Sequence, residues 1–208
     1  MGVVPPPYRI ETDRLVIRVY EPRDAPLLKE AIDASLDHLR PWMPWARHEP
    51  QPLEQKLALL RAFRGRFDLG TDFAYGVFEP DESRQLGGAG LHPRGGEGSL
   101  EIGYWIRADA VGRGLATEVT AVLTRVGFEQ CALIRVDVQV DPANERSARI
   151  PRKLGFVEEG RLRRRLEPHE DGGERRDSLM FTMLAEELAA SPCMRYAYRA
   201  YDALGAEL

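Results

Sequence analysis

Residues 100–118 read LEIGYWIRADAVGRGLATE, and this stretch joins a strand pattern to a helix start through a glycine turn. Apolar and aromatic residues dominate residues 100–106, which is typical of a strand. Gly112 and Gly114 then precede a helical pattern of apolar residues at Leu115, Val119, Val122, Leu123 and Val126. Glycines before a helix let the backbone approach a ligand, and the first helical turn offers unpaired N–H groups. The stretch therefore predicts a phosphate-binding loop.

Two common phosphate-binding motifs are excluded by spacing. A P-loop needs Lys followed by Ser or Thr after its last glycine, whereas Leu115 and Ala116 follow Gly114. A dinucleotide fingerprint needs a third glycine where Thr117 stands. A turn that uses glycine only for its geometry stays open as the alternative.

The loop resembles the acetyl-CoA loop of the GNAT superfamily of N-acetyltransferases, whose pattern is Gln or Arg, two residues, Gly, one residue, then Gly or Ala. Val111 stands here where that family has Gln or Arg. Backbone N–H groups hold most of a pyrophosphate, so the departure puts only one side-chain contact in doubt. The resemblance implies that the CoA pyrophosphate contacts Val111, Gly112, Arg113, Gly114, Leu115, Ala116 and Thr117.

Composition favours one α/β domain with a tail: 208 residues, 43% hydrophobic and 30% charged, with a net charge of -4. We expect the domain over residues 1–184 and a helical tail over 185–208. The charge gives no global basic field for nucleic acid or an anionic membrane. No apolar run approaches a membrane span, and residues 1–7 lack the regions of a signal peptide, so we expect a cytoplasmic protein.

Cysteine and histidine spacing predicts no disulfide and no metal site. Cys131 and Cys193 are far apart in the sequence, and we expect Cys131 to be a small buried hydrophobe. The four histidines, which are also scattered, are His38, His48, His92 and His169.

The order of elements predicts a mixed, largely antiparallel sheet flanked by helices, because three strands follow one another through short turns. A doubly wound parallel sheet is disfavoured. The predicted helices cover residues 22–35 and 53–69 and begin at Leu115 and after Asn144. The predicted strands cover residues 12–19, 73–79, 85–92, 100–106, 134–140, 156–166 and 175–184.

Glu101 is a candidate general base, because it is a carboxylate within an otherwise apolar strand. Side chains alternate along the strand, so Glu101 shares one face with Gly103 and Trp105. Burial raises the pKa of a carboxylate, which suits a base. The alternative is a solvated glutamate or one paired with an arginine. The family resemblance supports the base, since many members place one on this strand. Fallback candidates are Glu158, Glu159 and Glu167.

Residues 144–147 and 153–156 resemble the second GNAT motif, Asn-x-x-Ser followed by Lys-Leu-Gly-Phe. The resemblance implies that Asn144 contacts the pantetheine arm and that Ser147 lies near the CoA sulfur, where its hydroxyl could serve the departing thiolate. From the residues alone, Asn144 could merely cap a helix whose first turn holds Ser147.

Two segments resemble the RimJ/RimL branch of that family, which acetylates N-termini of ribosomal proteins. One is the Thr-x-Arg-Leu opening at residues 12–15, and the other is the stretch 38–45 with its two tryptophans. By that resemblance Trp42 and Trp45 line the acceptor site, to which we also assign Tyr104. The alternative is that both tryptophans simply close the core under a long loop.

The resemblance implies a GNAT fold whose central strands splay beside Ile106 and Arg107, with one of their backbone N–H groups holding the oxyanion. The implied reaction moves acetyl from acetyl-CoA to a primary amine. A protein N-terminus demands less of the base than lysine does, since their pKa values lie near 8 and 10.4. The alternatives are a small-molecule amine as acceptor and a non-catalytic acyl-CoA sensor.

Two surface features leave alternatives open. The basic run at Arg161, Arg163, Arg164 and Arg165 favours a solvated strand edge over a docking patch for an acidic partner or the CoA 3'-phosphate. In the tail, Met194, Tyr198, Tyr201 and Leu204 recur at helical spacing. That stripe would cap its own domain or pack on a second copy, and members of the branch are often homodimers.

Overall fold

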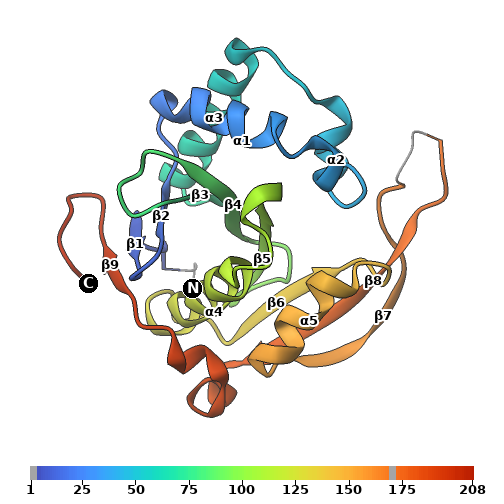
Figure 1. The fold of residues 1–208 in the computed structure, drawn as a ribbon. Helices are drawn as coiled ribbons and strands as arrows, with labels where there is room; N and C mark the ends of the chain where they lie inside the picture. The colour runs from blue at the N-terminus through green and yellow to red at the C-terminus, as the bar shows by residue number, and fades with distance from the viewer. Residues whose placement is uncertain (1–3, 169–171) are drawn as a thin grey trace.

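The computed structural model describes residues 4–168 and 172–208, and these residues form one nine-stranded sheet with helices on both faces (Figure 1). The order across the sheet is β7-β8-β6-β5-β4-β3-β2-β1-β9. The strands are β1 (Arg9–Glu11), β2 (Val16–Val19), β3 (Phe73–Phe78), β4 (Gln85–His92), β5 (Ser99–Ile106), β6 (Arg135–Val140), β7 (Val157–Leu166), β8 (Arg176–Leu184) and β9 (Arg199–Tyr201).

Within the described residues, five α-helices and five short 3-10 turns connect these strands. The α-helices are α1 (Ala25–Asp33), α2 (Leu36–Leu39), α3 (Leu53–Asp68), α4 (Leu115–Glu129) and α5 (Glu145–Leu154). The 3-10 turns are η1 (Pro22–Asp24), η2 (Pro44–His48), η3 (Ala108–Ala110), η4 (Ala185–Ala190) and η5 (Pro192–Arg195). The predicted mixed, largely antiparallel architecture is therefore confirmed, and most predicted elements begin and end within a residue or two of the observed ones.

β5 and β6 form a parallel pair, whereas the other strand neighbours of the described sheet run antiparallel. Their pairing covers only Ser99↔Arg135 to Glu101↔Asp137, after which the strands part. The strands are thus already apart beside Ile106, where the splay was predicted, and the gap begins directly after Glu101. Each strand is held by its own outer neighbour, β5 by β4 and β6 by β8.

The two sheet faces carry separate apolar layers. Ile102 and Ile106 of β5 pack with the buried face of α4, whereas Trp105 packs with the cluster that includes α1. This split is the alternation predicted for β5. Figure 1 shows α1 and α3 beyond one side of the sheet and α4 and α5 on the other.

The prediction of one strand over residues 12–19 is wrong in its first half. β1 ends at Glu11, and β2 begins only at Val16. Between them the Thr12 N–H donates to the Leu15 carbonyl at 2.9 Å, and the Thr12 hydroxyl accepts from the Leu15 N–H at 3.0 Å. A threonine that bonds its own backbone neighbours favours a turn over a strand.

The predicted helix in the tail is also wrong. Residues 185–195 form the two 3-10 turns, and β9 then pairs antiparallel with β1. Pro192 starts the second turn, and the Ser191 hydroxyl caps it by accepting from the Cys193 N–H at 3.1 Å. The tail nevertheless docks on its own chain, as one of the two predicted alternatives required: the Tyr198 hydroxyl donates to Glu129 of α4 at 2.7 Å.

Candidate active site

The glycine loop adopts a backbone conformation that other residues avoid. Gly112 and Gly114 both have φ of +79°, and Gly114 is the N-cap of α4. A Cβ on Gly112 would meet nothing within 4 Å, so the requirement for glycine is conformational and not one of space. The first helical hydrogen bond runs from the Glu118 N–H to Gly114, which leaves the N–H groups of Leu115, Ala116 and Thr117 ahead of it. This loop fits a pyrophosphate.

Val111 and Arg113 differ in what they offer the loop. Val111 has extended backbone and is half-buried, with its side chain against the main core. Arg113 is exposed, and its carbonyl accepts from Arg14 Nη1 at 3.2 Å. At the position where the family has Gln or Arg, Val111 thus supplies packing in place of a polar side chain.

A buried carboxylate in the first turn of α4 is neutralised from the β1–β2 turn. Glu118 is 4% exposed, and its Oε1 accepts from the Thr12 hydroxyl at 2.6 Å. Its Oε2 accepts from Arg14 Nε at 2.9 Å and also contacts Arg14 Nη2. Without this partner, a negative charge would stand beside the loop that fits a phosphate.

Tyr104 and Ser147 meet across the gap between β5 and β6. Their hydroxyl oxygens lie 2.9 Å apart, and burial raises the pKa of Tyr104 to about 12, so the phenol stays protonated near neutral pH. Asn144 caps α5, because its Oδ1 accepts from the Ser147 N–H at 3.1 Å. The structure thus brings together the predicted Tyr104, Asn144 and Ser147.

Glu101 is buried and paired, which is the alternative that the sequence left open. Its side chain is 7% exposed, Oε1 accepts from Arg94 Nη1 at 2.7 Å, and Oε2 accepts from Gln139 Nε2 at 2.8 Å. Both carboxylate oxygens therefore already hold a donor.

Of the two predicted oxyanion donors, Arg107 is engaged elsewhere. Its N–H donates to the Leu86 carbonyl at 2.9 Å, and its buried guanidinium bonds Glu30 and Asp109. Along a strand, successive peptide groups face opposite edges, so the Ile106 N–H faces the β6 side, where the strands have parted.

The two predicted tryptophans lie in the connection from α2 to α3. The Trp45 ring packs edge-on against Trp105 of β5, with centroids 5.9 Å apart, and remains 37% exposed. Trp42 is half-buried in the same connection. Trp45 therefore covers the sheet face on which Glu101 and Trp105 lie, while part of its ring stays open to solvent.

A histidine and an aspartate that sequence reasoning missed lie on this same face. His92 Nδ1 is 2.6 Å from Asp72 Oδ1, and His92 is the cross-strand partner of Glu101. The sequence signal is the glycine alternation of β4, Gly88 and Gly90, which leaves the sheet face bare for larger rings.

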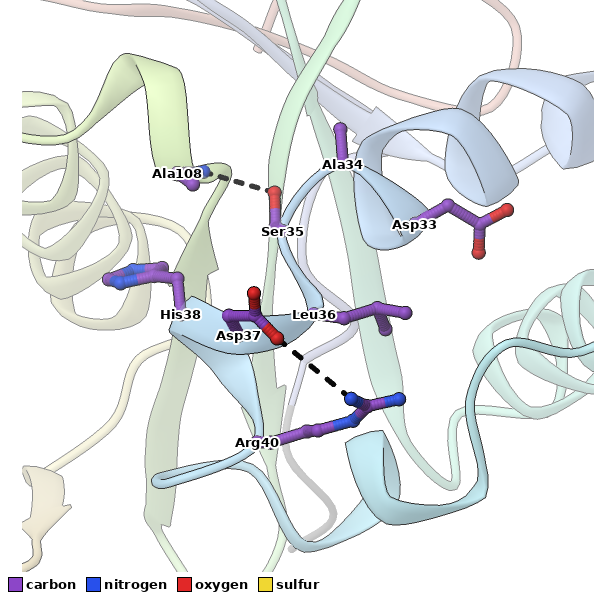
Figure 2. A pocket seen from close by; sticks show the side chains of 8 residues that line it. All are labelled: Asp33, Ala34, Ser35, Leu36, Asp37, His38, Arg40 and Ala108. Carbon is purple, nitrogen blue, oxygen red and sulfur yellow. Dashed lines mark hydrogen bonds and ion pairs between the residues drawn. The ribbon is translucent and has the colours of Figure 1, made fainter.

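A cavity of roughly 450 Å³ opens where α1 meets α2, beside the turn that follows β5. Figure 2 shows the His38 imidazole of α2 and the guanidinium of Arg40, which follows α2, extending in different directions. Burial and the nearby charge of Arg146 lower the pKa of His38 below its usual value. The Ala108 N–H donates to the Ser35 hydroxyl at 3.0 Å. The cavity is lined by Asp33, Ala34, Ser35, Leu36, Asp37, His38, Arg40 and Ala108.

The fallback bases lie on exposed parts of the β7–β8 hairpin. Glu158 is paired with Arg152 at 2.8 Å, Glu159 is exposed, and Glu167 pairs with Arg47 of η2 at 3.1 Å. β7 is an edge strand of the sheet, and its arginines are mostly exposed, as in Arg161 with Asp177 at 2.8 Å. This arrangement fits the solvated-edge interpretation. The predicted loop of this hairpin, with His169, lies partly outside the described residues.

Both cysteines are buried free thiols. Burial raises the pKa of Cys131 to about 12, which fits the expected small buried hydrophobe. Within residues 4–168 and 172–208, no three His, Cys, Asp or Glu side chains are grouped so as to hold a metal ion. In the same part of the chain, no helix has both the length and the apolar character that a membrane span needs.

Comparisons with known proteins agree with this fold. The family profile described as "Acetyltransferase (GNAT) domain" matches residues 14–157. The ribosomal protein uS5-alanine N-acetyltransferase of Escherichia coli is 31% identical over 161 residues, which cover 74% of this chain and 81% of that protein.

Two solved structures illustrate the likeness. RimJ of Mycobacterium smegmatis, solved with a CoA-disulfide, is 26% identical with a TM-score of 0.76, covering 94% of this chain and 95% of its own. The microcin C7 self-immunity acetyltransferase MccE, solved with acetyl-CoA and AMP, is 16% identical with a TM-score of 0.74. It covers 83% of this chain and 93% of its own, and at that identity it shares the fold alone.

Proposed function

Since the chain belongs to the GNAT family of acetyltransferases, we propose that it moves an acetyl group from acetyl-CoA to the N-terminal α-amine of a protein, and specifically of a ribosomal protein. The observation that carries the acceptor is the 31% identity to the uS5-alanine N-acetyltransferase over most of both chains. The fold alone does not identify the acceptor. MccE has the same fold, yet its name assigns it to microcin C7 self-immunity.

The glycine loop would hold the pyrophosphate of acetyl-CoA through the N–H groups of Gly112, Gly114 and the first turn of α4. Gly112 and Gly114 support this role by their left-handed backbone. Arg14 supports it by neutralising Glu118, which leaves the positive end of α4 for the phosphates.

The gap between β5 and β6 would admit the pantetheine arm and the thioester. The Ile106 N–H faces this gap and would donate to the oxyanion as it forms. Ser147 would give its proton to the departing thiolate, and Tyr104 would orient the Ser147 hydroxyl, in support of which their oxygens lie 2.9 Å apart. Asn144 holds the start of α5 and thereby the position of Ser147.

The acceptor would enter from the opposite face, past Trp45 and the cavity at α1 and α2. Two carboxylates line that cavity: Asp33, which pairs with Lys29 at 2.5 Å, and Asp37, which lies 3.9 Å from Arg40. A cationic N-terminus would share these carboxylates with their present partners. The ring of Trp45 would pack on the first residues of the peptide, which its partial exposure supports.

Calorimetry of acetyl-CoA binding, followed by thiol release against peptides, tests this proposal. We expect turnover with a peptide that begins with the N-terminus of uS5, and mass spectrometry should place the acetyl group on its α-amine. The matched control is the same peptide with a blocked N-terminus and a free lysine. Turnover on the blocked peptide, or only on small amines, would contradict the proposed acceptor, and failure to bind acetyl-CoA would contradict the role of the glycine loop.

A protein that modifies ribosomal proteins would work in the cytoplasm, and we include that location in the proposal. We also propose that the chain forms a homodimer, as members of the branch that it resembles often do. Light scattering after size exclusion would measure the mass of the particle, and a monomer at micromolar concentration would contradict the dimer.

A further inference from the structure

The imidazole of His92 lies over Gly90 and Gly103, two residues without side chains, on the proposed acceptor face of the sheet. A Cβ built on Gly90 would lie 2.5 Å from His92 Nε2, and one built on Gly103 would lie 3.2 Å from the same atom. A Cβ on Gly88 would lie 2.5 Å from Trp105 Nε1. Because Gly88 and Gly90 share one face of β4, the His92 and Trp105 rings lie on that same face.

Asp72 fixes the tautomer of this imidazole. With Nδ1 donating to the Asp72 carboxylate at 2.6 Å, the lone pair lies on Nε2, the atom nearest to Gly103. Burial opposes ionisation of Asp72, but the bond from His92 and the charges of Arg66 and Arg94 outweigh it and lower the pKa of that carboxyl. The charged groups around His92 are thus Asp72, which bonds it, Glu101, its cross-strand partner on β5, and Arg94, which follows β4 and pairs with Glu101. Arg66, near the end of α3, adds its charge through Asp72.

Along β5, Nε2 of His92 lies beside Gly103, close to the point where the thioester would react. Gly103 stands just past the end of the β5–β6 pairing and next to Tyr104, which contacts Ser147 through the gap. A thioester in the gap and the Nε2 atom would therefore face β5 from its two sides.

We propose that His92 accepts the proton that the acceptor amine must lose, directly or through one water, with Asp72 as its positioning partner. This inference rests on the proposed function. Glu101, the base expected from the sequence, already holds Arg94 and Gln139 on its two oxygens. On the same face, Nε2 of His92 carries a lone pair, and histidine is the side chain that most readily exchanges protons near neutral pH.

The protons balance as follows. The ammonium gives one proton to His92 Nε2, and the freed lone pair forms the C–N bond to the acetyl carbon. The C–S bond then breaks, and the thiolate takes a proton from Ser147, which regains one from the nitrogen. His92 returns its proton to solvent, so the products are the acetylated amine, the free thiol and one proton.

Two substitutions of His92 separate proton transfer from structure. Asparagine keeps an N–H near the position of Nδ1 and can still bond Asp72, but it has no basic nitrogen. We expect His92→Asn to lower kcat by about 10²-fold at pH 7, and by less at pH 9, where more of the amine is already neutral. Affinity for acetyl-CoA, measured by calorimetry, should not change. Added imidazole should restore part of the kcat of His92→Ala.

His48, an exposed histidine of η2, gives the matched control, and His48→Gln should leave kcat unchanged at each pH. Full activity of His92→Asn across the pH range would overturn the inference. So would a loss in His92→Ala that imidazole does not restore, combined with normal activity in His92→Asn, since that pattern marks a structural role. If wild-type protein acetylates no peptide, the proposed function itself fails, which is a different result.

Glu101→Gln tests the competing base in the same assay. The glutamine amide cannot take the proton, but its carbonyl can still accept from one of the two present donors. We expect its kcat to keep the wild-type dependence on pH. A variant that loses this dependence while His92→Asn retains it would return the role to Glu101.

Discussion

The hydroxyl of Tyr104 lies 2.9 Å from the hydroxyl of Ser147, so β5 and α5 touch across the gap that separates β5 from β6. This contact joins β5, which borders the gap, to the first turn of α5. It places two hydroxyl groups where a thiolate would leave.

Ser147→Ala should lower kcat by about 10-fold or more while acetyl-CoA affinity changes little, because the hydroxyl acts on the thiolate that forms during the reaction. Steady-state kinetics and calorimetry on the same preparation measure the two quantities. Tyr104→Phe is the matched variant, since it removes the partner hydroxyl and should give a smaller loss. An equal fall in turnover and affinity for Ser147→Ala would make the residue a binding contact only.

Gly114→Asp should abolish acetyl-CoA binding with the fold intact. The substitution puts a side chain on a backbone with φ of +79° and a negative charge at the N-terminus of α4, where the phosphates would lie. Calorimetry measures the binding, and circular dichroism checks the fold. Gly205→Asp is the control, because Gly205 has a similar φ of +81° in the tail. Unchanged affinity in Gly114→Asp would remove the loop from the site.

Arg14→Ala should weaken acetyl-CoA binding, because it leaves the buried Glu118 charge unpaired beside the loop. Removing one partner of such a pair also costs about 1–3 kcal/mol of folding stability. Adding Glu118→Gln to Arg14→Ala should recover part of the affinity, since the unpaired charge is then gone. Arg64→Ala, which breaks the exposed pair with Asp68, is the control. If the double variant binds no better than Arg14→Ala, the charge argument fails.

Stability should fall at acid pH partly through His38. Burial and Arg146 lower the pKa of His38 in the folded protein below its usual 6.5, so the unfolded chain binds more protons as the pH drops below that value. Acid therefore favours unfolding, and His38→Gln should narrow the difference in Tm between pH 7.5 and pH 5.5. His48→Gln should leave this difference as in the wild type. An identical difference in His38→Gln and wild type would contradict the role of His38.

The features that sequence predicts well here are local. The glycine loop follows from the positions of Gly112 and Gly114, and the two faces of β5 follow from alternation, because both depend on neighbours in the chain. The tail is different: the spacing of Tyr198 and Tyr201 looks helical, yet pairing with β1 draws that segment into a strand. In this segment, pairing with β1 outweighs the local preference for a helix.

Site contacts between residues of separate strands could not be predicted from the sequence, because they depend on how the strands are arranged in the fold. The donors to Glu101 are Arg94, after β4, and Gln139, in β6, and no spacing rule links them to residue 101. The same holds for His92 and Asp72, which are joined only when β3 and β4 lie side by side. The Tyr104–Ser147 contact likewise exists only because α5 packs across the gap.

The gap between β5 and β6 is kept open by the sheet itself, since β4 and β8 hold the two parting strands along their lengths. A ligand that enters it has no strand pair to separate. Less of the interaction energy is then lost to rearrangement, so acetyl-CoA should bind with little change in backbone and at a rate set mainly by encounter.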